Sequence, residues 1–417
     1  MSRHILIAGG GIIGLFTAYY VAERGYSVTV LERGPVNHDG CSFGNGGMVV
    51  PSHFIPLAAP GMVRLGLKWM WNPESPFYVR PRLSWELLDW GWKFNRAATA
   101  RHVDLAAPLL RDLHLASRAC YEELAERTGN EFGLVKRGLL MLCRTRQALD
   151  EEAHVAEFGR RLGVPADILA PAQVASVEPN LSLDVAGAVY FPNDCHLVPA
   201  ALMACLTKRL TQAGVQFVWD TAVTGWRAGG DRIQAILTTG GDYVADEYVI
   251  CGGAWSSALV RSLGLRLPMQ AGKGYSLTLP QPRRLPSVCA ILTEARVAVT
   301  PMGSALRFAG TMEIAGLDLG IHPRRVQGII KSVPRYFPDF QPQDFSRIQP
   351  WCGLRPCSPD GLPYIGRFGR FANLSVASGH AMMGISLGPV TGKLMAEILT
   401  GETPSLKIEQ LSPSRYN

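Results

Sequence analysis

The chain has 417 residues, of which 47% are hydrophobic, so it can bury a large core and is expected to fold as two domains. Its net charge of +7 arises without a long run of Lys or Arg, which argues against nucleic acid as a partner and suits anionic small molecules. The nine cysteines are scattered without a CxxC pair or a metal-ligand pattern, which indicates reduced thiols in the cytoplasm and no metal site.

The first thirty-two residues predict a nucleotide-binding βαβ unit. Residues 5–8 read as a buried strand, residues 15–24 as a helix ended by Gly25, and residues 28–31 as a second strand. Residues 5–22 carry no charge, yet the glycines and the strand-like start of this run argue against a membrane span or a signal peptide.

The turn between the first strand and the helix has the spacing GxGxxG. Gly9 is expected to make the turn, Gly11 to let the backbone approach a pyrophosphate, and Gly14 to let helix and strand pack closely. The helix N-terminus would hold the phosphates, while Glu32, followed by Arg33, would accept hydrogen bonds from the ribose hydroxyls. This fingerprint alone does not separate FAD from NAD.

A second glycine-rich loop, residues 41–48, follows this unit and suits the close approach of backbone to a flat or charged ligand. Its candidate cofactor contacts are Ser42, Asn45, Gly46, Gly47 and Met48. His53 follows the loop as a candidate substrate contact, although a single histidine is more often structural.

Five of the nine tryptophans fall between Trp69 and Trp92, among Leu, Met, Pro and Arg. We favour a core or subunit-interface role for this segment. The alternative is a patch that meets the inner face of the membrane, where a quinone would be a natural electron acceptor.

The middle of the chain predicts helices over residues 104–128, 146–162 and 199–213 and a small antiparallel meander over 223–245. Residues 248–253 and 373–380 then repeat the strand-to-glycine pattern of the N-terminus, and the second leads into a helix over 390–399. Three such junctions suit a long FAD that lies across one domain. Its further candidate contacts are Val223, Gly253 and Gly384.

Several motifs together resemble the FAD-dependent D-amino acid oxidase family, which includes D-amino acid dehydrogenases, glycine oxidase and sarcosine oxidase. The matching segments span nearly the whole chain and include the N-terminal fingerprint and residues 41–48 with Pro51, 57–61, 273–277, 353–356, 359–361, 378–380 and 411–416. They look closest to bacterial D-amino acid dehydrogenases and to their relatives that oxidise cis-4-hydroxy-D-proline.

The resemblance implies an α/β fold of two domains, each discontinuous in sequence. A Rossmann-like FAD-binding domain is expected from residues 1–50, 190–265 and 345–417, and an α+β substrate domain built on a β-sheet from residues 51–189 and 266–344. The FAD is expected to be non-covalent, because the spacing from Cys352 to Pro359 and Asp360 departs from that of sarcosine oxidase relatives.

Oxidation of an amino acid requires hydride delivery from Cα to the flavin N5, with the substrate carboxylate held in place. Arg355 of Gly-Leu-Arg-Pro is the expected clamp, because a guanidinium pairs a carboxylate bidentately and the family's matching arginine does so. The alternative is a structural ion pair. Tyr275 is expected as a second carboxylate contact or lid, His380 near the flavin edge, and Lys273 either near the flavin or at the surface.

The sequence departs from glycine oxidase after Gly379 and His380, where Ala381-Met382-Met383 stands in place of an arginine. Met382 would make this wall of the pocket apolar, which favours an apolar or ring substrate. The expected function is therefore oxidation of a D-amino acid, such as D-proline or cis-4-hydroxy-D-proline, to an imino acid and then a 2-oxo acid, with electrons passed to a quinone or another acceptor. A glycine- or sarcosine-type oxidase that releases hydrogen peroxide is the alternative. A third reading is a tRNA-modifying or structural flavoprotein that keeps the fold without amine oxidation, which the absence of basic clusters disfavours.

Overall fold

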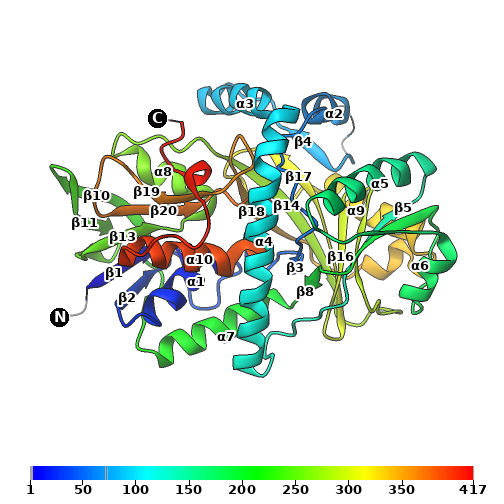
Figure 1. Ribbon diagram of the computed structural model, residues 1–417, viewed down its shortest axis with the longest axis horizontal. Helices are drawn as coiled ribbons and strands as arrows, with labels where there is room; N and C mark the ends of the chain where they lie inside the picture. The colour runs from blue at the N-terminus through cyan, green and yellow to red at the C-terminus, as the bar shows by residue number, and fades with distance from the viewer. Residues whose placement is uncertain (1–2, 71, 73, 417) are drawn as a thin grey trace.

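The computed structural model describes residues 3–70, 72 and 74–416 (Figure 1). A six-stranded sheet has the order β19-β20-β13-β1-β2-β9, and its strands pair in parallel except for β19. These strands are β1 (His4–Ala8), β2 (Ser27–Leu31), β9 (Gln216–Val218), β13 (Glu247–Ile250), β19 (Tyr364–Arg367) and β20 (Leu374–Ser378). The mainly parallel sheet confirms the expected α/β, Rossmann-like architecture.

A nine-stranded sheet forms the other half of the molecule, in the order β18-β14-β17-β16-β15-β5-β7-β6 with β4 beside β17. Its strands are β4 (Phe77–Val79), β5 (Leu139–Cys143), β6 (Asp167–Leu169), β7 (Gly187–Phe191), β14 (Gln270–Leu279), β15 (Cys289–Leu292), β16 (Val297–Met302), β17 (Ala305–Ile314) and β18 (Trp351–Cys357). Most neighbours pair antiparallel, so each of their strands can present one face to a core and the other to a ligand.

Two smaller sheets and ten helices complete the described part of the chain. The predicted meander consists of β10 (Val223–Gly229), β11 (Arg232–Thr238) and β12 (Gly241–Tyr243), and β3 (Met48–Val49) pairs with β8 (Cys195–His196). The helices are α1 (Ile12–Ala22), α2 (Met62–Trp69), α3 (Trp85–Ala97), α4 (Ala100–Thr128), α5 (Arg146–Arg161), α6 (Pro171–Val177), α7 (Pro199–Gln212), α8 (Ser256–Arg261), α9 (Pro323–Tyr336) and α10 (Gly384–Thr400).

The largest hydrophobic cluster joins α1, α4, α7 and α10, and α4 runs across the middle of the molecule between the two large sheets (Figure 1). Phe16 of α1 meets Tyr121 of α4 edge to face at 5.7 Å between ring centroids. A Cβ at Gly392 of α10 would stand 2.4 Å from the backbone carbon of Phe16, so α1 and α10 pack closely because position 392 has no side chain. This packing fixes the first turns of both helices relative to each other.

Helix α10 begins at Gly384, six residues before the expected start at residue 390, and it contains Pro389. Proline has no N–H to offer the carbonyl four residues earlier. The Tyr121 hydroxyl donates instead to the Ile385 carbonyl at 2.6 Å, which satisfies that oxygen. A tertiary contact that leaves no local sequence signal therefore extends the helix.

The two large sheets follow the expected domain boundaries except at β18 and β7. All six strands of the first sheet come from residues 1–50, 190–265 and 345–417, but so does β18, which pairs with β14 of the nine-stranded sheet. Strand β7 also crosses the expected boundary at residue 190. Sequence signals mark where a strand ends and do not indicate the sheet that the strand joins, so the pairing of β18 could not be read from the sequence.

Within the described ranges, no helix has the length and hydropathy needed to span a membrane. The uncharged run of residues 5–22 divides into β1, a glycine turn and α1, as the βαβ interpretation predicts.

Candidate active site

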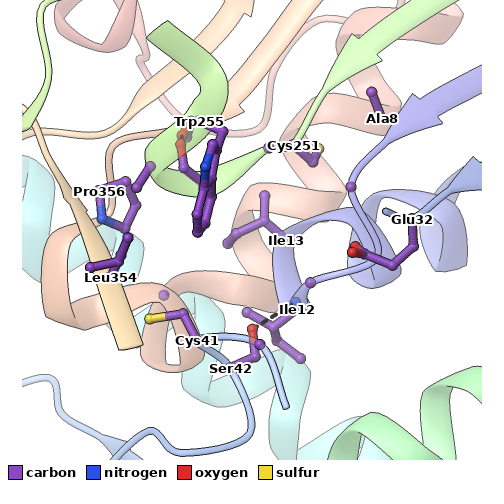
Figure 2. Close-up of a pocket in the computed structure, with 18 of the residues that line it drawn as sticks. Ala8, Ile12, Ile13, Glu32, Cys41, Ser42, Cys251, Trp255, Leu354 and Pro356 are labelled. Atoms are coloured by element: carbon purple, nitrogen blue, oxygen red, sulfur yellow. Dashed lines mark hydrogen bonds between the residues drawn. The ribbon is translucent and has the colours of Figure 1, made fainter. Parts of the chain in front are cut away.

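A cavity of about 310 Å³, here called the main cavity, opens at the carboxyl edge of the six-stranded sheet (Figure 2). The ends of β1, β2, β13 and β20 all reach it, through Ala8, Glu32, Cys251 and Ser378. In open parallel sheets, ligands bind beyond the carboxyl ends of the strands.

The glycines of the first turn make this cavity possible. Gly9 has φ +123°, and a Cβ there would stand 2.4 Å from the Cys251 carbonyl oxygen. A Cβ at Gly14 would stand 1.9 Å from the Gly9 carbonyl oxygen, so Gly14 lets the helix pack on the turn without itself lining the cavity. Gly11 lines the cavity, and a Cβ there would meet only Ser42 Oγ, at 3.5 Å.

The N-terminus of α1 faces the cavity and is suited to an anion. Ser42 Oγ accepts a hydrogen bond from the Ile12 N–H at 3.0 Å, which fixes the 41–48 loop against the first turn of the helix (Figure 2). The N-cap residue is Gly11, which has no side chain to cap the helix, and the partial positive charge of the helix N-terminus favours a phosphate.

Glu32 stands at the end of β2 with both carboxylate oxygens fixed. Oε2 accepts from the Gly10 N–H at 2.8 Å and Oε1 from the Gly34 N–H at 2.9 Å. Each oxygen keeps a further lone pair for a ribose hydroxyl. Beside it, the Arg33 guanidinium lies 3.5 Å from the centroid of the Trp255 ring, and both residues line the cavity.

The lining therefore fits a dinucleotide that carries a flat ring system. It offers a glycine cradle, a helix N-terminus for the pyrophosphate and a carboxylate for the ribose. Apolar walls follow from Ile12, Ile13, Leu354 and Pro356 (Figure 2). In the part of the chain that the structure describes, no group of His, Cys, Asp or Glu could hold a metal ion.

Three candidates from the 41–48 loop do not reach the main cavity, whereas Ser42 and Asn45 do. The Gly46 carbonyl accepts from Thr300 Oγ1 at 2.6 Å. Gly47 has φ +71° and packs against the Leu197 carbonyl, and Met48 pairs with His196. These residues tie the loop to neighbouring strands, and the cofactor role expected for Gly46, Gly47 and Met48 stays a prediction.

His380 lines the cavity and is neutral. It is 3% exposed, and burial lowers its pKa to about 3. Nε2 shares a hydrogen bond with Thr391 Oγ1 at 3.0 Å, and Nδ1 is buried without a partner among the described residues. The other predicted contacts, Val223, Gly253 and Gly384, also line the cavity.

Arg355 lies at the rim of this site. Leu354 and Pro356 line the cavity, while the Arg355 side chain leaves the other face of β18 and lies over Gly274. Its Nη1 donates to the Thr311 carbonyl, and no carboxylate pairs with it within the described ranges. Burial lowers the Arg355 pKa. The guanidinium therefore has no anionic partner within the described ranges, so a structural ion pair does not account for Arg355.

Cys41 lines the main cavity and is affected electrostatically by Arg355. Burial raises the pKa of the Cys41 thiol to about 11, and the neighbouring Arg355 opposes that rise. Arg355 therefore acts on the pKa of one residue of the cavity wall.

Tyr275 and Arg355 point to opposite faces of the sheet, and the substrate contact expected for Tyr275 stays a prediction. Successive residues of a strand point to opposite faces, and Gly274 lies under Arg355. The Tyr275 hydroxyl instead donates to Glu313 Oε2 at 2.8 Å in the core between the sheet and α9. Lys273 shares that face and is neither at the cavity nor at the surface: it is fully buried, 3.1 Å from Asp318 Oδ2.

His53 does not line the main cavity, and its expected substrate contact stays a prediction. Its Nδ1 is 3.0 Å from Ser52 Oγ, which donates to the buried Asp194. Burial lowers the His53 pKa to about 4.

Met382 does not line the main cavity either, but it packs in an apolar cluster with Trp90, Met312 and Cys357. A Cβ at Gly272, the register partner of Arg355, would meet the sulfurs of Met312 and Cys357. The apolar cluster therefore lies on the Arg355 face of the sheet.

Several lining residues were not among the predicted contacts. Cys251, Gly252, Ala254 and Trp255 follow the strand-to-glycine junction at residues 248–253, and that junction could have identified them. Leu354 and Pro356 flank Arg355 and gave no signal, because their role depends on the pairing of β18 with β14.

Comparison with known proteins agrees with this geometry. Residues 4–398 match the family model described as FAD dependent oxidoreductase (DAO). The chain is 33% identical over 423 residues to a D-amino acid dehydrogenase of Granulibacter bethesdensis and 35% identical over 437 residues to one of Methylobacterium radiotolerans, and each alignment covers 99% of both proteins. The crystal structure of glycine oxidase from Geobacillus kaustophilus superposes with a TM-score of 0.80 at 26% identity, covering 100% of both chains. The chain therefore belongs to the DAO family of FAD-dependent oxidoreductases, and FAD is its cofactor.

Proposed function

We propose that this enzyme oxidises a D-amino acid, preferably an apolar or cyclic one such as D-proline or cis-4-hydroxy-D-proline. The first product is an imino acid, which water converts to a 2-oxo acid when the nitrogen is not part of a ring. Bound FAD supplies the acceptor for the hydride that leaves Cα. The names of the curated relatives support a D-amino acid as the substrate class.

The unpaired guanidinium of Arg355 is the observation that carries this proposal. It has no carboxylate partner within the described ranges, and it lies on the strand whose Leu354 and Pro356 line the main cavity. A substrate carboxylate would supply the missing anion through a charge-assisted pair of hydrogen bonds. A carboxylate fixed at Arg355 would restrict the position of Cα, as an oxidation at Cα requires.

The apolar surroundings of Arg355 support an apolar or ring side chain. Met312, Cys357, Met382 and Trp90 form one cluster on this face of the sheet. A charged substrate side chain would lose its hydration there without a partner in return. A neutral His380 adds no positive charge at the cavity wall.

The proposal is tested by anaerobic bleaching of the flavin absorbance with single amino acids. The panel contains both enantiomers of alanine and proline, cis-4-hydroxy-D-proline, glycine and sarcosine. We expect rapid bleaching by apolar or cyclic D-isomers and slow bleaching by glycine. If no amino acid reduces the flavin of FAD-loaded protein, the proposal is wrong.

An oxidase of glycine or sarcosine type is the second candidate, since the similarity to glycine oxidase extends over the whole chain. Oxygen consumption and peroxide release, compared with quinone or dye reduction on the same substrate, separate the two. We propose that the enzyme is a dehydrogenase with a quinone as acceptor, because helix α3 exposes an apolar face.

Helix α3 has an exposed apolar face that supports contact with a membrane holding the quinone. Trp85 is 79%, Leu88 63% and Trp92 57% exposed, at spacings that place them on one face. Trp90 on the opposite face is 6% exposed and donates to the Cys357 carbonyl at 2.9 Å. One face of α3 therefore packs in the core and the other is exposed to solvent. Trp71 of the tryptophan-rich segment lies outside the described residues.

Basic side chains accompany this exposed face. Arg64 and Lys68 are exposed on the neighbouring α2, and the Arg96 guanidinium lies 4.8 Å from the centroid of the Trp92 ring. Both helices lie next to each other along one edge of the molecule, at the top of the view (Figure 1). Tryptophan with arginine and lysine suits the interface of an anionic bilayer. We propose that α2 and α3 rest on the inner face of the membrane and give a quinone access to the enzyme.

A further inference from the structure

A second cavity of about 400 Å³, here called the side cavity, lies on the nine-stranded sheet. Ser276 and Thr278 of β14 form its floor, and Phe43 and Trp351 stand at its walls. Arg355 does not line this cavity, and the Trp351 ring lies between the two. A ligand of the side cavity would therefore occupy a place of its own, apart from the expected substrate clamp.

Arg307 brings a positive charge into the side cavity, and no carboxylate pairs with it within the described ranges. Its Nε donates to Thr278 Oγ1 at 2.9 Å, and its Nη1 donates to the carbonyls of Phe43 and Asn45 at 2.9 and 2.8 Å. The Nη2 group has no partner among these residues and is not enclosed by protein, so its two N–H groups remain available to a ligand. Burial lowers the pKa of Arg307 to about 10, and an anion in the cavity would offset this loss of hydration.

Two hydroxyl groups on the floor can donate to the same anion. Ser276 is 3% exposed, yet its hydroxyl forms no hydrogen bond with the described part of the chain and is not enclosed by protein. Thr278 Oγ1 accepts from Arg307, so its own O–H is free to donate. Residues two apart on a strand point to one face, and Thr278 is the register partner of Arg307. The free donors therefore gather on one floor.

The lining charges favour an anion. Arg347 lines the side cavity, is exposed, and forms no hydrogen bond or ion pair with any described residue. Asp39 is the one lining carboxylate, so Arg307 and Arg347 leave the lining with a net charge of +1. A ligand that carries a negative group, with or without a positive one, complements this arrangement.

The walls of the side cavity favour an organic ligand over a bare inorganic anion. Phe43, Trp351 and Ile348 present apolar surface beside the polar floor. The Trp351 ring is fixed in advance, because its Nε1 donates to the Asp39 carbonyl at 3.0 Å and a Cβ at Gly44 would stand 2.1 Å from it. Apolar walls with a few fixed polar groups are typical of sites for small organic molecules. Inorganic phosphate would use the donors and leave these walls in water.

We propose that the side cavity is a second binding site for a small organic carboxylate, which Arg307, Ser276 and Thr278 hold while Phe43 and Trp351 contact its carbon skeleton. The site goes beyond the proposed oxidation and does not depend on Arg355. Two kinds of molecule offer the required carboxylate. One is a 2-oxo acid, and the other is an amino acid, whose ammonium group Asp39 would pair.

The experiment is titration calorimetry of FAD-loaded protein with sodium pyruvate. It is carried out in the Arg355→Gln variant, so that the expected substrate clamp does not contribute. We expect one pyruvate to bind per chain. Adding Ser276→Ala and Arg347→Gln together should weaken this binding at least about tenfold, because a hydroxyl donor and a charged group are lost. Neither side chain bonds to the rest of the described chain, so the variant should keep its fold and its FAD.

Arg324→Gln in the same background is the matched control. Arg324 is an exposed arginine of α9, which packs on the opposite face of the sheet, so the change in net charge equals that of Arg347→Gln. We expect this control to bind pyruvate as the Arg355→Gln variant does. Inorganic phosphate should bind more weakly than pyruvate.

Three results would overturn the site. Loss of pyruvate binding on Arg355→Gln alone would show that carboxylates bind only at the clamp, which leaves the proposed function intact. Unchanged binding after Ser276→Ala and Arg347→Gln would show that pyruvate binds elsewhere. Phosphate that binds more tightly than pyruvate would contradict the choice of an organic carboxylate.

A second titration identifies the source of the carboxylate. 2-Methylalanine has no hydrogen on Cα, so the proposed reaction cannot consume it. If it binds more tightly than pyruvate and Asp39→Asn removes the difference, the ligand is an amino acid. If pyruvate binds more tightly, the ligand is a 2-oxo acid. Either result supports the carboxylate site.

Discussion

The guanidinium of Arg355 lies over the backbone of Gly274 on the neighbouring strand, and a Cβ at residue 274 would stand 2.1 Å from its Nη2. Real Cβ atoms do not approach other heavy atoms this closely. The glycine therefore decides where the guanidinium can lie, and any side chain at residue 274 must displace it.

Replacing Gly274 by alanine tests this relationship. We expect Gly274→Ala to retain FAD but to reduce its flavin about 100-fold more slowly, because the clamp is displaced by about 1 Å or more. Anaerobic stopped-flow measures the rate. Gly225→Ala in β10 is the control, since its Cβ would make an ordinary contact at 3.5 Å. Equal rates in the native enzyme and in Gly274→Ala would contradict the assignment.

Replacing Gly14 in the glycine turn by alanine should impair cofactor binding. A Cβ at Gly14 would stand 1.9 Å from the Gly9 carbonyl oxygen, so Gly14→Ala must push α1 away from the turn that cradles the pyrophosphate. We expect purified Gly14→Ala to contain little FAD and to unfold at a lower temperature. Gly369→Ala, with nothing within 4 Å of the new Cβ, should keep its full FAD content. The ratio of flavin to protein absorbance checks both variants.

The C-terminal segment is fixed by a buried ion pair between Asp360 and Arg415. Arg415 Nε is 2.7 Å from Asp360 Oδ2, and Nη2 is 3.0 Å from Oδ1. Burial acts to raise the pKa of Asp360, but the pairing with Arg415 outweighs it and the pKa is lowered. This pair links two of the family-like segments, residues 359–361 and 411–416.

The lowered pKa of Asp360 fixes the pH dependence of its contribution. A carboxyl whose pKa is lower in the folded state stabilises the fold above its unfolded pKa of about 3.9, and this contribution is lost as pH falls through the folded pKa. We expect Asp360→Asn to cost about 3 kcal/mol of unfolding free energy at pH 7, because Arg415 is left buried without its partner. Urea unfolding at pH 7 and at lower pH measures the cost. A cost that stays constant as the carboxyl protonates would contradict this account.

The exposed face of α3 predicts membrane binding that two substitutions should weaken. Changing Trp85 and Leu88 together to serine removes most of the apolar area offered to a bilayer, so we expect at least tenfold weaker binding to anionic vesicles. Val244→Ser is the control, because Val244 is 69% exposed on a loop of the three-stranded sheet. Vesicle co-sedimentation measures binding. If the native protein stays in the supernatant at low salt, the membrane proposal is wrong.

The N-terminal unit could be predicted because its signals are local. The turn requires a positive φ at Gly9 and a close contact between Gly14 and the Gly9 carbonyl. Glu32, at the end of the second strand, then lies beside the turn and accepts from the Gly10 N–H. Each requirement falls on a residue type that the sequence displays directly. The junctions before Gly253 and Gly384 followed from the same pattern, and both residues line the cavity.

The contacts across the two sheets could not be predicted in this way. Tyr275 and Gly274 are adjacent in sequence, but the direction of each side chain depends on the register of β14 against β18. Lys273 is not at the surface but buried, because its ammonium group contacts Asp318 and Glu313, which come from a distant loop and strand. Gly47 has a positive φ, and a Cβ there would stand 2.4 Å from the Leu197 carbonyl oxygen, a packing requirement that local sequence does not display.

The central claim is that Arg355 holds the substrate carboxylate, and the most direct measurement compares D-proline with pyrrolidine, the same ring without the carboxylate. Anaerobic flavin reduction by both compounds is measured in the native enzyme and in Arg355→Gln, each loaded with FAD. We predict that the native enzyme prefers D-proline by at least about 100-fold and that Arg355→Gln loses this preference while keeping its FAD. An Arg355→Gln enzyme that still prefers D-proline as strongly as the native enzyme would contradict the account.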